Sequence, residues 1–518
     1  MSKTKPTLGA ALALILLIGS VPWPSAESQQ LQAQDDEALA AALTLERAFI
    51  GAIQRAEKSV VSIARYKLPS TVGGRFRENL RRIPSVGFPS DDFVPNEFGS
   101  GVLIAAGDAS TQPVVLTNYH VVRGGPLVGS PAVAGTSGLL IRFSDRRLST
   151  AAILAADPRS DLAVLQLDLT ETGIKPASLA PFRLRTATNI RKGKLVVAIG
   201  NPYSLARDGS SSAGWGIVAN ITRRPASPAV PKNEPDPRIL ETIHHFGTLL
   251  QIDARLNLGY SGGALVDLRG DLIGITTSLA ALDGYEKSVG YAIPIDAATR
   301  RVIDSLVQGY EAEYGFLGIE LKTVSLEGMR SLGHEFGQPT ATRATRVVSH
   351  SPAAQAGLLR NDMILSVNRT AVYDSYDLMR QVGQLGPGMT ASLRIWRDRE
   401  RKELTLPVKL GKWPVRDDEG IVATKRRFPE WRGLSVDYPT ARARYLPYRL
   451  NRYYQAVLVT NVAPQSPAEL AELKSGDYIT QLNQRSVETP DEFDTEVAKL
   501  KGDVVVKLID GRRVVLRP

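Results

Sequence analysis

The amino-acid sequence predicts a mainly β protein whose C-terminal part is one module used twice. From about residue 98 to residue 296, short β-rich runs such as "GSGVLIAA", "PVVLTNYHVV" and "KLVVAIG" recur between Gly and Pro turn signals. Many short strands with this punctuation indicate an all-β barrel or sandwich. The module is repeated because "SPAAQAGLLRNDMILSVN" begins at Ser351 and "SPAELAELKSGDYITQLN" begins at Ser466, an offset of 115 residues.

Other segments join these parts. Residues 295–310 carry apolar residues at helical spacing and end in Gly-Tyr, so we expect a helix that closes the β domain. Residues 66–98 and 223–241 are rich in proline or glycine and predict two long loops. Residues 27–44 are rich in Gln, Ala, Glu and Asp, which indicates a linker or a short exposed helix.

Composition excludes several classes of protein. The chain has 518 residues, 43% of them hydrophobic and 22% charged, which is ordinary for a globular protein of roughly three domains. Its formal charge is +10, but its short basic stretches lack the interleaved aromatics of nucleic-acid readers, so we expect no nucleic-acid partner. It has no cysteine, which excludes disulfides and thiolate metal sites. Without a Walker-type loop or a dinucleotide fingerprint, we expect no cofactor and no metal.

The N-terminus predicts export. Two lysines precede the 14-residue apolar run "LGAALALILLIGSV", and small residues follow at Ser25 and Ala26. This layout is typical of a signal peptide, and the run is shorter than the roughly 20 residues of a membrane span. Pro24 lies close to the expected cleavage site after Ala26 and is unfavourable there. An uncleaved N-terminal membrane anchor is therefore the alternative. We therefore expect the periplasm or cell envelope, with membrane association through the N-terminus as an option.

One stretch, "NLGYSGGALVD", surrounds Ser261 with glycines. A serine hydroxyl becomes a nucleophile only beside a general base, which an acid orients. Of the five histidines, His120 ends an apolar run, and Asp161 directly precedes an alternating strand. The order His, Asp, Ser is that of chymotrypsin-type enzymes. The competing interpretations are a small residue in a tight turn, a structural histidine and a turn aspartate.

The other histidines predict no site. His244 and His245 are adjacent, so on a strand they would face opposite sides, which is poor geometry for a shared metal. His334 and His350 lie in the repeated region.

The whole set of motifs resembles one known family. The segments "FGSGVLI", "LTNYHVV", "DPRSDLAVLQL", "AIGNPY", "QIDARLNLGYSGGALVDLRGDLIGITT" and "GYAIPID" resemble, in order, the HtrA/Deg family of trypsin-like serine proteases. The two repeats resemble its C-terminal PDZ domains. The resemblance implies two six-stranded β-barrels with the active site between them. It implies His120 as general base, Asp161 as its orienting acid and Ser261 as nucleophile.

The resemblance also implies domain boundaries and a cellular role. The role is ATP-independent quality control of unfolded or misfolded proteins by a homotrimer or larger homo-oligomer. The expected domains are a signal peptide or anchor at 1–26, a linker at 27–44, a trypsin-like protease domain at 45–300, a first PDZ domain with its connecting helix at 301–411, a linker at 412–429 and a second PDZ domain at 430–518.

Further site residues follow from the same resemblance. The N–H groups of Gly259 and Ser261, with Tyr260 between them, would form the oxyanion hole, since glycine can take the backbone geometry that this needs. Leu256 falls where the family lines a small apolar pocket, which suggests cleavage after Val or Ala. The family usually reads "TNNHV" and "GNSGG", so Tyr119 and Tyr260 each replace an asparagine. We hypothesise that Tyr260 holds the oxyanion loop in a resting state.

The repeats carry their own prediction. PDZ domains bind a C-terminal carboxylate with backbone N–H groups and add the peptide as a strand. Residues Phe316, Leu317, Gly318 and Ile319 resemble this carboxylate loop in the first copy. In the second copy Arg432 replaces an apolar residue, so assembly or regulation fits as well as peptide capture. A PDZ-mediated chaperone or scaffold with weak or no proteolysis is the alternative function, and a narrow regulatory protease is a third.

Overall fold

The structure is a computed structural model. It describes residues 26–67, 98–107, 112–129, 137–170, 172–201, 210–223, 242–277, 289–332 and 336–518. The expected signal peptide and most of the expected loops at 66–98 and 223–241 lie outside the described residues. The chain forms two compact units, Met1–Gly51 and Ala52–Pro518.

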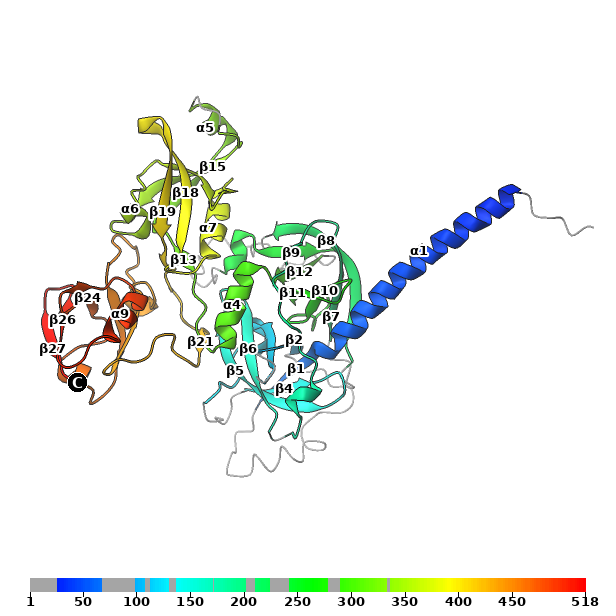
Figure 1. Cartoon of the computed structure of the whole chain (residues 1–518), viewed down its shortest axis with the longest axis horizontal. Helices are drawn as coiled ribbons and strands as arrows, with labels where there is room; N and C mark the ends of the chain where they lie inside the picture. The colour runs from blue at the N-terminus through cyan, green and yellow to red at the C-terminus, as the bar shows by residue number, and fades with distance from the viewer. Residues whose placement is uncertain are drawn as a thin grey trace, which may run out of the picture. The chain divides into compact units, whose positions relative to one another are not determined.

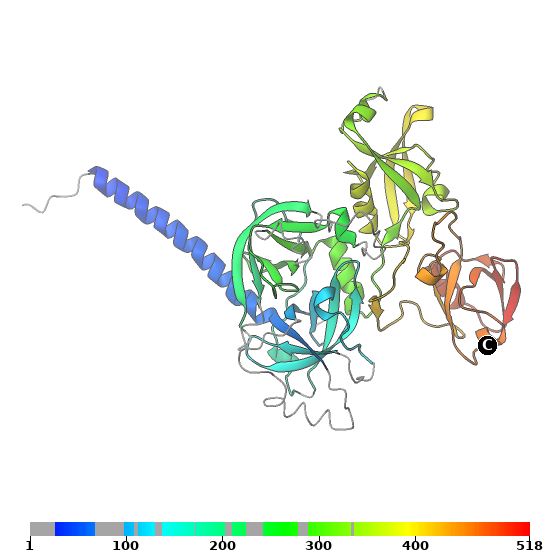
Figure 2. The same ribbon diagram turned by 180° about the vertical axis from the view of Figure 1, so that it is seen from behind.

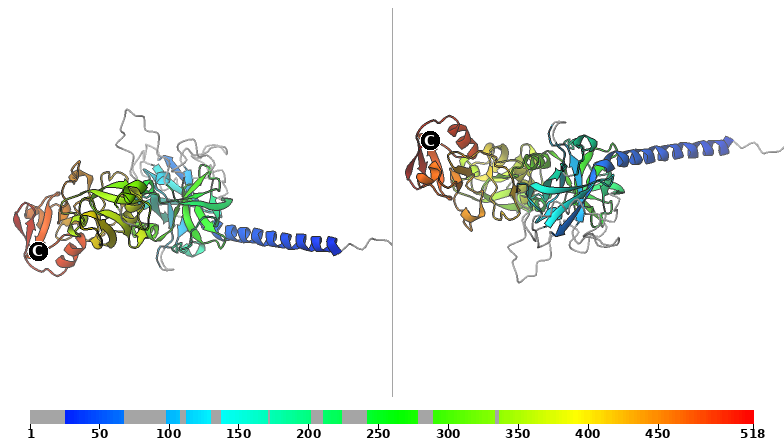
Figure 3. Two further views of the ribbon diagram at one scale, coloured as in Figure 1. Left: turned by 90° about the horizontal axis from the view of Figure 1, so that it is seen from above. Right: turned by 90° about the horizontal axis from the view of Figure 1, so that it is seen from below.

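The helix α1 (Ala26–Ala56) is a single element of 31 residues, and Figure 3 draws it unbroken. Residues 27–44 are therefore helical, and the helix is longer than the short one that the composition suggested. Within the described ranges, no helix combines the length and the apolar character that crossing a membrane requires.

The first barrel consists of six strands that follow α1. Their order is β5-β4-β1-β2-β3-β6, and a further pairing of β5 with β6 closes the barrel (Figure 1). The strands are β1 (Val60–Lys67), β2 (Phe98–Ile104), β3 (Val114–Asn118), β4 (Ser137–Arg142), β5 (Leu148–Asp157) and β6 (Leu162–Asp168).

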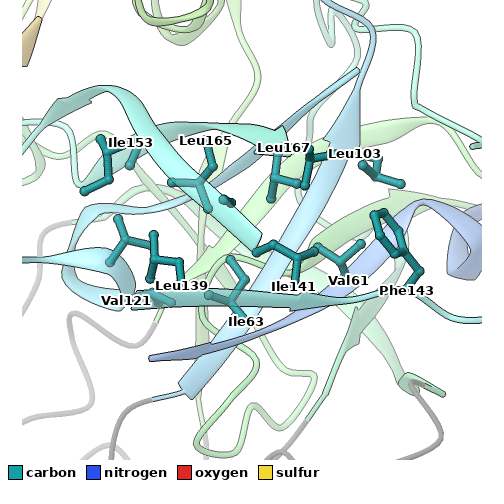
Figure 4. Close-up of a cluster of buried hydrophobic side chains, with 14 of the residues drawn as sticks. Val61, Ile63, Leu103, Val121, Leu139, Ile141, Phe143, Ile153, Leu165 and Leu167 are labelled. Carbon is teal, nitrogen blue, oxygen red and sulfur yellow. The ribbon is translucent and has the colours of Figure 1, made fainter. Parts of the chain in front are cut away.

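The core of the first barrel is aliphatic. Val61 and Ile63 of β1 lie among side chains from β4 and β6, including Ile141 and Leu165 (Figure 4). Alternate residues of a strand share a face, so pairs such as Val61 and Ile63 reach the interior together. Burying each such side chain stabilises the fold by roughly 1.5–3 kcal/mol.

The second barrel also has six strands. It closes in the order β10-β11-β12-β9-β8-β7, so the predicted pair of six-stranded barrels is confirmed (Figure 2). The strands are β7 (Leu195–Gly200), β8 (Ser212–Arg223), β9 (Leu249–Ile252), β10 (Ala264–Asp267), β11 (Leu272–Thr277) and β12 (Gly290–Pro294). The expected helix follows as α4 (Ala297–Val307), which begins where the Asp296 side chain accepts a hydrogen bond from the Thr299 N–H.

The two repeats fold alike. The first has the strand order β14-β15-β16-β18-β19 and the second has the order β22-β23-β24-β26-β27, so each forms the same sheet. Ser351 and Ser466 each cap a short helix, α6 and α8, with the side-chain oxygen. The first repeat contains β14 (Ile319–Val324), α5 (Leu326–Arg330), β15 (Ala341–Val347), α6 (Pro352–Gln355), β16 (Met363–Val367), β17 (Thr370–Ala371), α7 (Ser375–Gly383), β18 (Thr390–Arg397) and β19 (Lys402–Lys409). The second contains β22 (Leu434–Asp437), β23 (Val457–Val462), α8 (Pro467–Leu470), β24 (Tyr478–Leu482), β25 (Arg485–Ser486), α9 (Pro490–Val497), β26 (Val504–Leu508) and β27 (Arg513–Leu516).

Residues 412–429, expected as a linker, contain ordered strands. The strand β20 (Gly411–Lys412) pairs with β13 (Gly315–Phe316), and β21 (Val422–Ala423) pairs with β5 of the first barrel. Each of these strands is only two residues long, too short for a periodic pattern in the sequence to reveal it.

Candidate active site

The structure brings His120 and Asp161 together. His120 lies in α3 (Tyr119–Val122), directly after β3, and Asp161 lies in the turn between β5 and β6. Because β3 pairs with β6, with Asn118 opposite Leu162, the two turns are neighbours. The His120 Nδ1 atom lies 2.9 Å from each carboxylate oxygen of Asp161.

The backbone around Asp161 is held in an uncommon conformation. Its φ is +52°, and its carbonyl accepts hydrogen bonds from the Tyr119 N–H at 3.0 Å and the Asn118 side chain at 3.1 Å. The carboxylate accepts further bonds from the His120 N–H at 3.1 Å and the Thr277 hydroxyl at 3.3 Å. These bonds fix the direction of the carboxylate, and a strained residue held by so many partners is typical of a functional site.

The environment favours the charged form of His120. Burial alone would lower its pKa, but the Asp161 charge and hydrogen bond outweigh burial, so the pKa lies above the ordinary value of 6.5. The His120 side chain is 35% exposed and that of Asp161 only 3%, so the imidazole keeps an accessible edge while its partner is enclosed.

Ser261 lies in a loop tied to both barrels. The Ser261 carbonyl accepts a hydrogen bond from the Ser100 N–H of the first barrel at 2.8 Å. The next residue, Gly262, donates to the Thr276 carbonyl of the second barrel at 2.9 Å, and Thr276 precedes the Thr277 that contacts Asp161. The loop that carries Ser261 and the pair of His120 and Asp161 therefore meet at the end of β11.

Two glycines make this close approach possible. A Cβ at Gly99 would lie 2.6 Å from Val121 and 3.1 Å from the Ser261 carbonyl, so only a glycine fits between the His120 turn and the serine loop. A Cβ at Gly262, whose φ is +84°, would overlap the Ser100 carbonyl and the Thr117 hydroxyl. Gly99 of β2 and Gly262 beside the serine thus have a steric purpose at this junction.

Tyr260 and Leu256 belong to the core of the second barrel. Tyr260 is 6% exposed and packs in its apolar cluster, and burial raises the pKa of its hydroxyl. The side chain fits because Gly200 stands beside it, where a Cβ would come within 2.9 Å of Tyr260 Cδ1. Leu256 is partly buried against the same cluster.

Three supporting residues carried no signal in the sequence. His244 is fully buried; its Nε2 lies 2.9 Å from the Ser160 carbonyl and its Nδ1 lies 2.6 Å from the Thr248 hydroxyl. Burial lowers the pKa of His244, which favours a neutral ring that buttresses the Asp161 turn. Ser100 and Thr277 are the other two. Across the described ranges, acidic residues and histidines nowhere gather into a group of three able to hold a metal ion.

The two PDZ-like loops share a glycine of positive φ but differ in the residue before it, since Arg432 has a φ of +51°, and in their contacts. Gly318 and Gly433 have φ of +79° and +85°, and each faces a capping serine. Leu317 is buried in the core of its module, and Ile319 opens β14, an edge strand. In the second copy the N–H of Leu434 donates to the Trp431 carbonyl at 2.8 Å, and the reverse bond is 3.0 Å.

Arg432 distinguishes the second copy further. Its guanidinium donates to the Leu516 carbonyl at 2.7 Å and to the Gly502 carbonyl at 2.6 Å. The arginine that replaces an apolar residue thus binds backbone of its own module.

Comparison with known proteins fits this architecture. A trypsin-like peptidase domain matches residues 99–275, and PDZ domains match residues 315–408 and 458–510. A probable periplasmic DegP-like serine endoprotease of Pseudomonas fluorescens is 30% identical over 407 residues, which cover 77% of this chain and 74% of that protein. The chain belongs to the HtrA/Deg family of serine proteases. It is a serine endopeptidase.

Other HtrA/Deg proteins align over similar lengths. A DegP-like protein of Pseudomonas fulva is 29% identical and covers 87% of this chain and 88% of its own. The solved HtrA-type protease AlgW with a decapeptide is 26% identical, covers 71% of this chain and 99% of its own, and has a TM-score of 0.46.

The His120–Asp161 contact predicts how the imidazole titrates. In Asp161→Asn we expect the pKa of His120 to fall, because the charge that outweighs burial is gone. Since the folded pKa of His120 is raised, the contact stabilises the native protein fully at pH below 6.5, and this contribution is lost as pH rises through the folded pKa. Proton NMR of the imidazole measures the pKa. Asp510→Asn in the second PDZ domain serves as control, and an equal His120 pKa in both variants would contradict the prediction.

Proposed function

We propose that Ser261 is the nucleophile, His120 the general base and Asp161 the acid that orients it. The observation that carries this proposal is the contact of His120 Nδ1 with both carboxylate oxygens. A carboxylate at Nδ1 keeps the proton on that nitrogen and leaves Nε2 to accept the serine proton. The imidazolium formed during attack then lies against the buried negative charge of Asp161. It gives its proton to the leaving amine as the peptide bond breaks, and water then hydrolyses the acyl-enzyme ester.

The N–H groups of Gly259 and Ser261, with Tyr260 between them, are proposed as the oxyanion hole. Gly259 has a φ of +100°, a conformation that side chains disfavour, and its carbonyl is fixed by the Ser100 hydroxyl at 2.6 Å. Because the Gly259 carbonyl is fixed in this way, the peptide units on either side of it have a fixed orientation. Each donor of such a hole contributes about 10²–10³ in turnover.

Leu256 is proposed to line the pocket for the residue before the cut. A Cβ at Gly290 would lie 2.9 Å from Leu256 Cγ and 2.6 Å from the Ala254 carbonyl. The wall is therefore closely packed, which supports cleavage after small aliphatic residues such as Val or Ala.

The proposed role is ATP-independent quality control of misfolded or damaged proteins in the periplasm or cell envelope. Two observations support it: the signal-like N-terminus, and relatives that are named periplasmic serine endoproteases. Unfolded chains are the proposed substrates, and the proposed assembly is a homotrimer or a larger homo-oligomer.

The first PDZ domain is proposed to bind C-terminal peptides through residues Phe316 to Ile319. Its strand β14 is at the edge of its sheet, so a peptide can add to it as a further strand. In the second domain the equivalent turn closes on itself through the paired bonds of Trp431 and Leu434. We therefore assign peptide capture to the first domain and a role in assembly or regulation to the second.

A chaperone or scaffold with weak proteolysis is the second candidate function. The observation that favours it is Tyr260, which anchors the oxyanion loop in the core of the second barrel where the family pattern has a smaller residue. A loop held there can rest in a form that does not support catalysis.

Replacing the proposed nucleophile decides between these functions. We expect Ser261→Ala to lower turnover of unfolded casein by on the order of 10⁶, because the triad acts as a unit. Ser486→Ala, at an exposed position of the second PDZ domain, is the control and should keep full activity. If the unchanged protein and Ser261→Ala cleave equally slowly while both suppress casein aggregation, the chaperone is the correct function.

Replacing Tyr260 tests the resting state. Tyr260→Asn removes the aromatic anchor, so we expect basal cleavage of casein to rise and the rate of fluorophosphonate labelling of Ser261 to rise with it. A basal turnover that stays the same or falls would show that Tyr260 does not restrain the loop.

A matched pair of glycines tests peptide capture. Gly318→Ala and Gly433→Ala introduce strain of the same kind, since each glycine has a positive φ and faces a serine. We expect only Gly318→Ala to weaken binding of a peptide with a free C-terminal carboxylate, by at least about tenfold, since hydrogen bonds to a charged group are worth about 1.5–3 kcal/mol. Calorimetry with the full chain measures this affinity. Equal losses in the two variants would contradict the assignment.

A further inference from the structure

The segment between the two PDZ domains is bonded to the protease domain. Its strand β21 pairs antiparallel with β5, with Val422 opposite Ala156 (Figure 1). The strand β4 pairs only with the start of β5, from Leu148 to Ala151, a bridge to Leu127 follows at Ile153, and β21 covers Ala155 and Ala156. Val422 packs against the core of the first barrel, and β21 is the seventh strand of that sheet, 266 residues after the paired Ala156.

A side chain and a backbone N–H fasten the segment directly after β21. The Thr424 hydroxyl donates to the Leu154 carbonyl of β5 at 2.8 Å. The N–H of Lys425 donates to the Gly309 carbonyl, which follows α4, at 3.0 Å. The segment is thus held at several points along its length.

A residue before β21 meets the turn that carries His120. Gly420 has a φ of +81°, and a Cβ there would overlap the hydroxyl of Tyr119. Tyr119 directly precedes His120 and packs, like Val422, against the core of the first barrel. Burial raises the pKa of the Tyr119 hydroxyl, and the acidic side chain of Glu419 adds to that effect. The segment between the two PDZ domains therefore forms one wall of the space that holds the Tyr119 ring.

A second connection reaches the turn that carries Asp161. Lys412, which is 1% exposed, lies 3.1 Å from Asp437 of β22 and 3.2 Å from Glu311. Glu311 in turn lies 3.5 Å from Arg159, whose Nε lies 2.6 Å from the buried Asp157. Arg159 also donates to the Ala312 carbonyl at 2.6 Å.

This chain of charges ends in the turn just before the proposed catalytic acid. Asp157 accepts a hydrogen bond from the Ser160 N–H at 3.2 Å, which fixes the turn immediately before Asp161. Although burial alone would raise it, the charges of Lys412, Arg159 and Arg442 lower the pKa of Glu311 to about 2. A buried pair that loses one member costs several kcal/mol, so the ions of this chain hold each other in place.

We propose that the segment Gly411–Asp437 is a positioning element of the protease, which holds Tyr119 and Arg159 and through them His120 and Asp161. The inference rests on the proposed roles of these two residues. Because the segment leads directly into β22, displacement of the second PDZ domain releases both connections and lowers turnover without touching the substrate site. Tyr119 and Arg159 are positioning residues in this arrangement.

The test compares Gly420→Ala with Gly357→Ala in the full chain. Both glycines have a φ of +81°, so alanine carries the same backbone strain, but a Cβ at Gly357 meets nothing within 4 Å. We expect Gly420→Ala to lower kcat for a short peptide ester by about 10², the cost of misplacing a catalytic group by about 1 Å, with KM unchanged. Gly357→Ala should keep both constants. Equal kcat values for the two variants would overturn the proposal.

A double variant shows whether the effect passes through Tyr119. Tyr119→Asn removes the ring that Gly420→Ala displaces. In the pair Tyr119→Asn with Gly420→Ala, we therefore expect the second change to add little to the loss of kcat. Losses that multiply independently would mean that Gly420 acts by another route and would overturn the assignment of Tyr119.

A third variant avoids any steric clash. Thr424→Val removes the bond to Leu154 with little change of shape, and we expect kcat to fall severalfold at constant KM. The control is Thr480→Val, whose hydroxyl donates to the Lys507 carbonyl within the second PDZ domain at 3.1 Å. If Gly420→Ala does not fold, equal kcat values for the two threonine variants overturn the proposal. Ser261→Ala is assayed with the same ester, because hydrolysis equal to that of the unchanged protein would instead refute the proposed function.

Discussion

The pairing of β3 with β6 is the constraint on which the candidate site depends. It sets Asn118 opposite Leu162, so the residues that follow one strand and precede the other meet at the same edge of the barrel. The Asp161 carbonyl then accepts from Asn118 and Tyr119, and its carboxylate reaches His120. His120 and Asp161 are therefore already in contact in this structure. The barrel thus brings the two turns together, and the hydrogen bonds fix the directions of the His120 and Asp161 side chains.

The buried charges at the junction with the PDZ domains favour one arrangement strongly. Lys412 is surrounded by the carboxylates of Glu311, Glu313 and Asp437, at 3.0 to 3.2 Å. Replacing a buried ion network by apolar residues is often neutral for stability, whereas breaking one member is costly. Any movement of the segment that carries Lys412 would therefore leave a buried charge without its partners. This is the property that a positioning element needs.

Much of the fold follows from the sequence because its signals are local. The alternation of β1 and β6, the helical spacing of α4 and the two "SPA" caps each depend on a few neighbouring residues. His120, Asp161 and Ser261 could be selected as well, since each stands at the end or start of a strand-like run. The residues that buttress them could not. Ser100, His244 and Thr277 act through contacts across 84 or more positions, and β21 is too short to have a pattern.

The two tyrosines that depart from the family pattern share a physical explanation. Tyr119 sits against Gly420, and Tyr260 sits against Gly200, so each large ring occupies space that a missing side chain in a distant segment provides. A tyrosine in place of an asparagine adds several ring atoms next to His120 or Ser261, and close-packed interiors admit such volume only where a neighbour is small. The two glycines differ in consequence. Gly200 belongs to β7 of the barrel itself, so Tyr260 is accommodated within one domain. Gly420 belongs to the segment between the PDZ domains, so the wall that confines Tyr119 exists only while that segment stays in place.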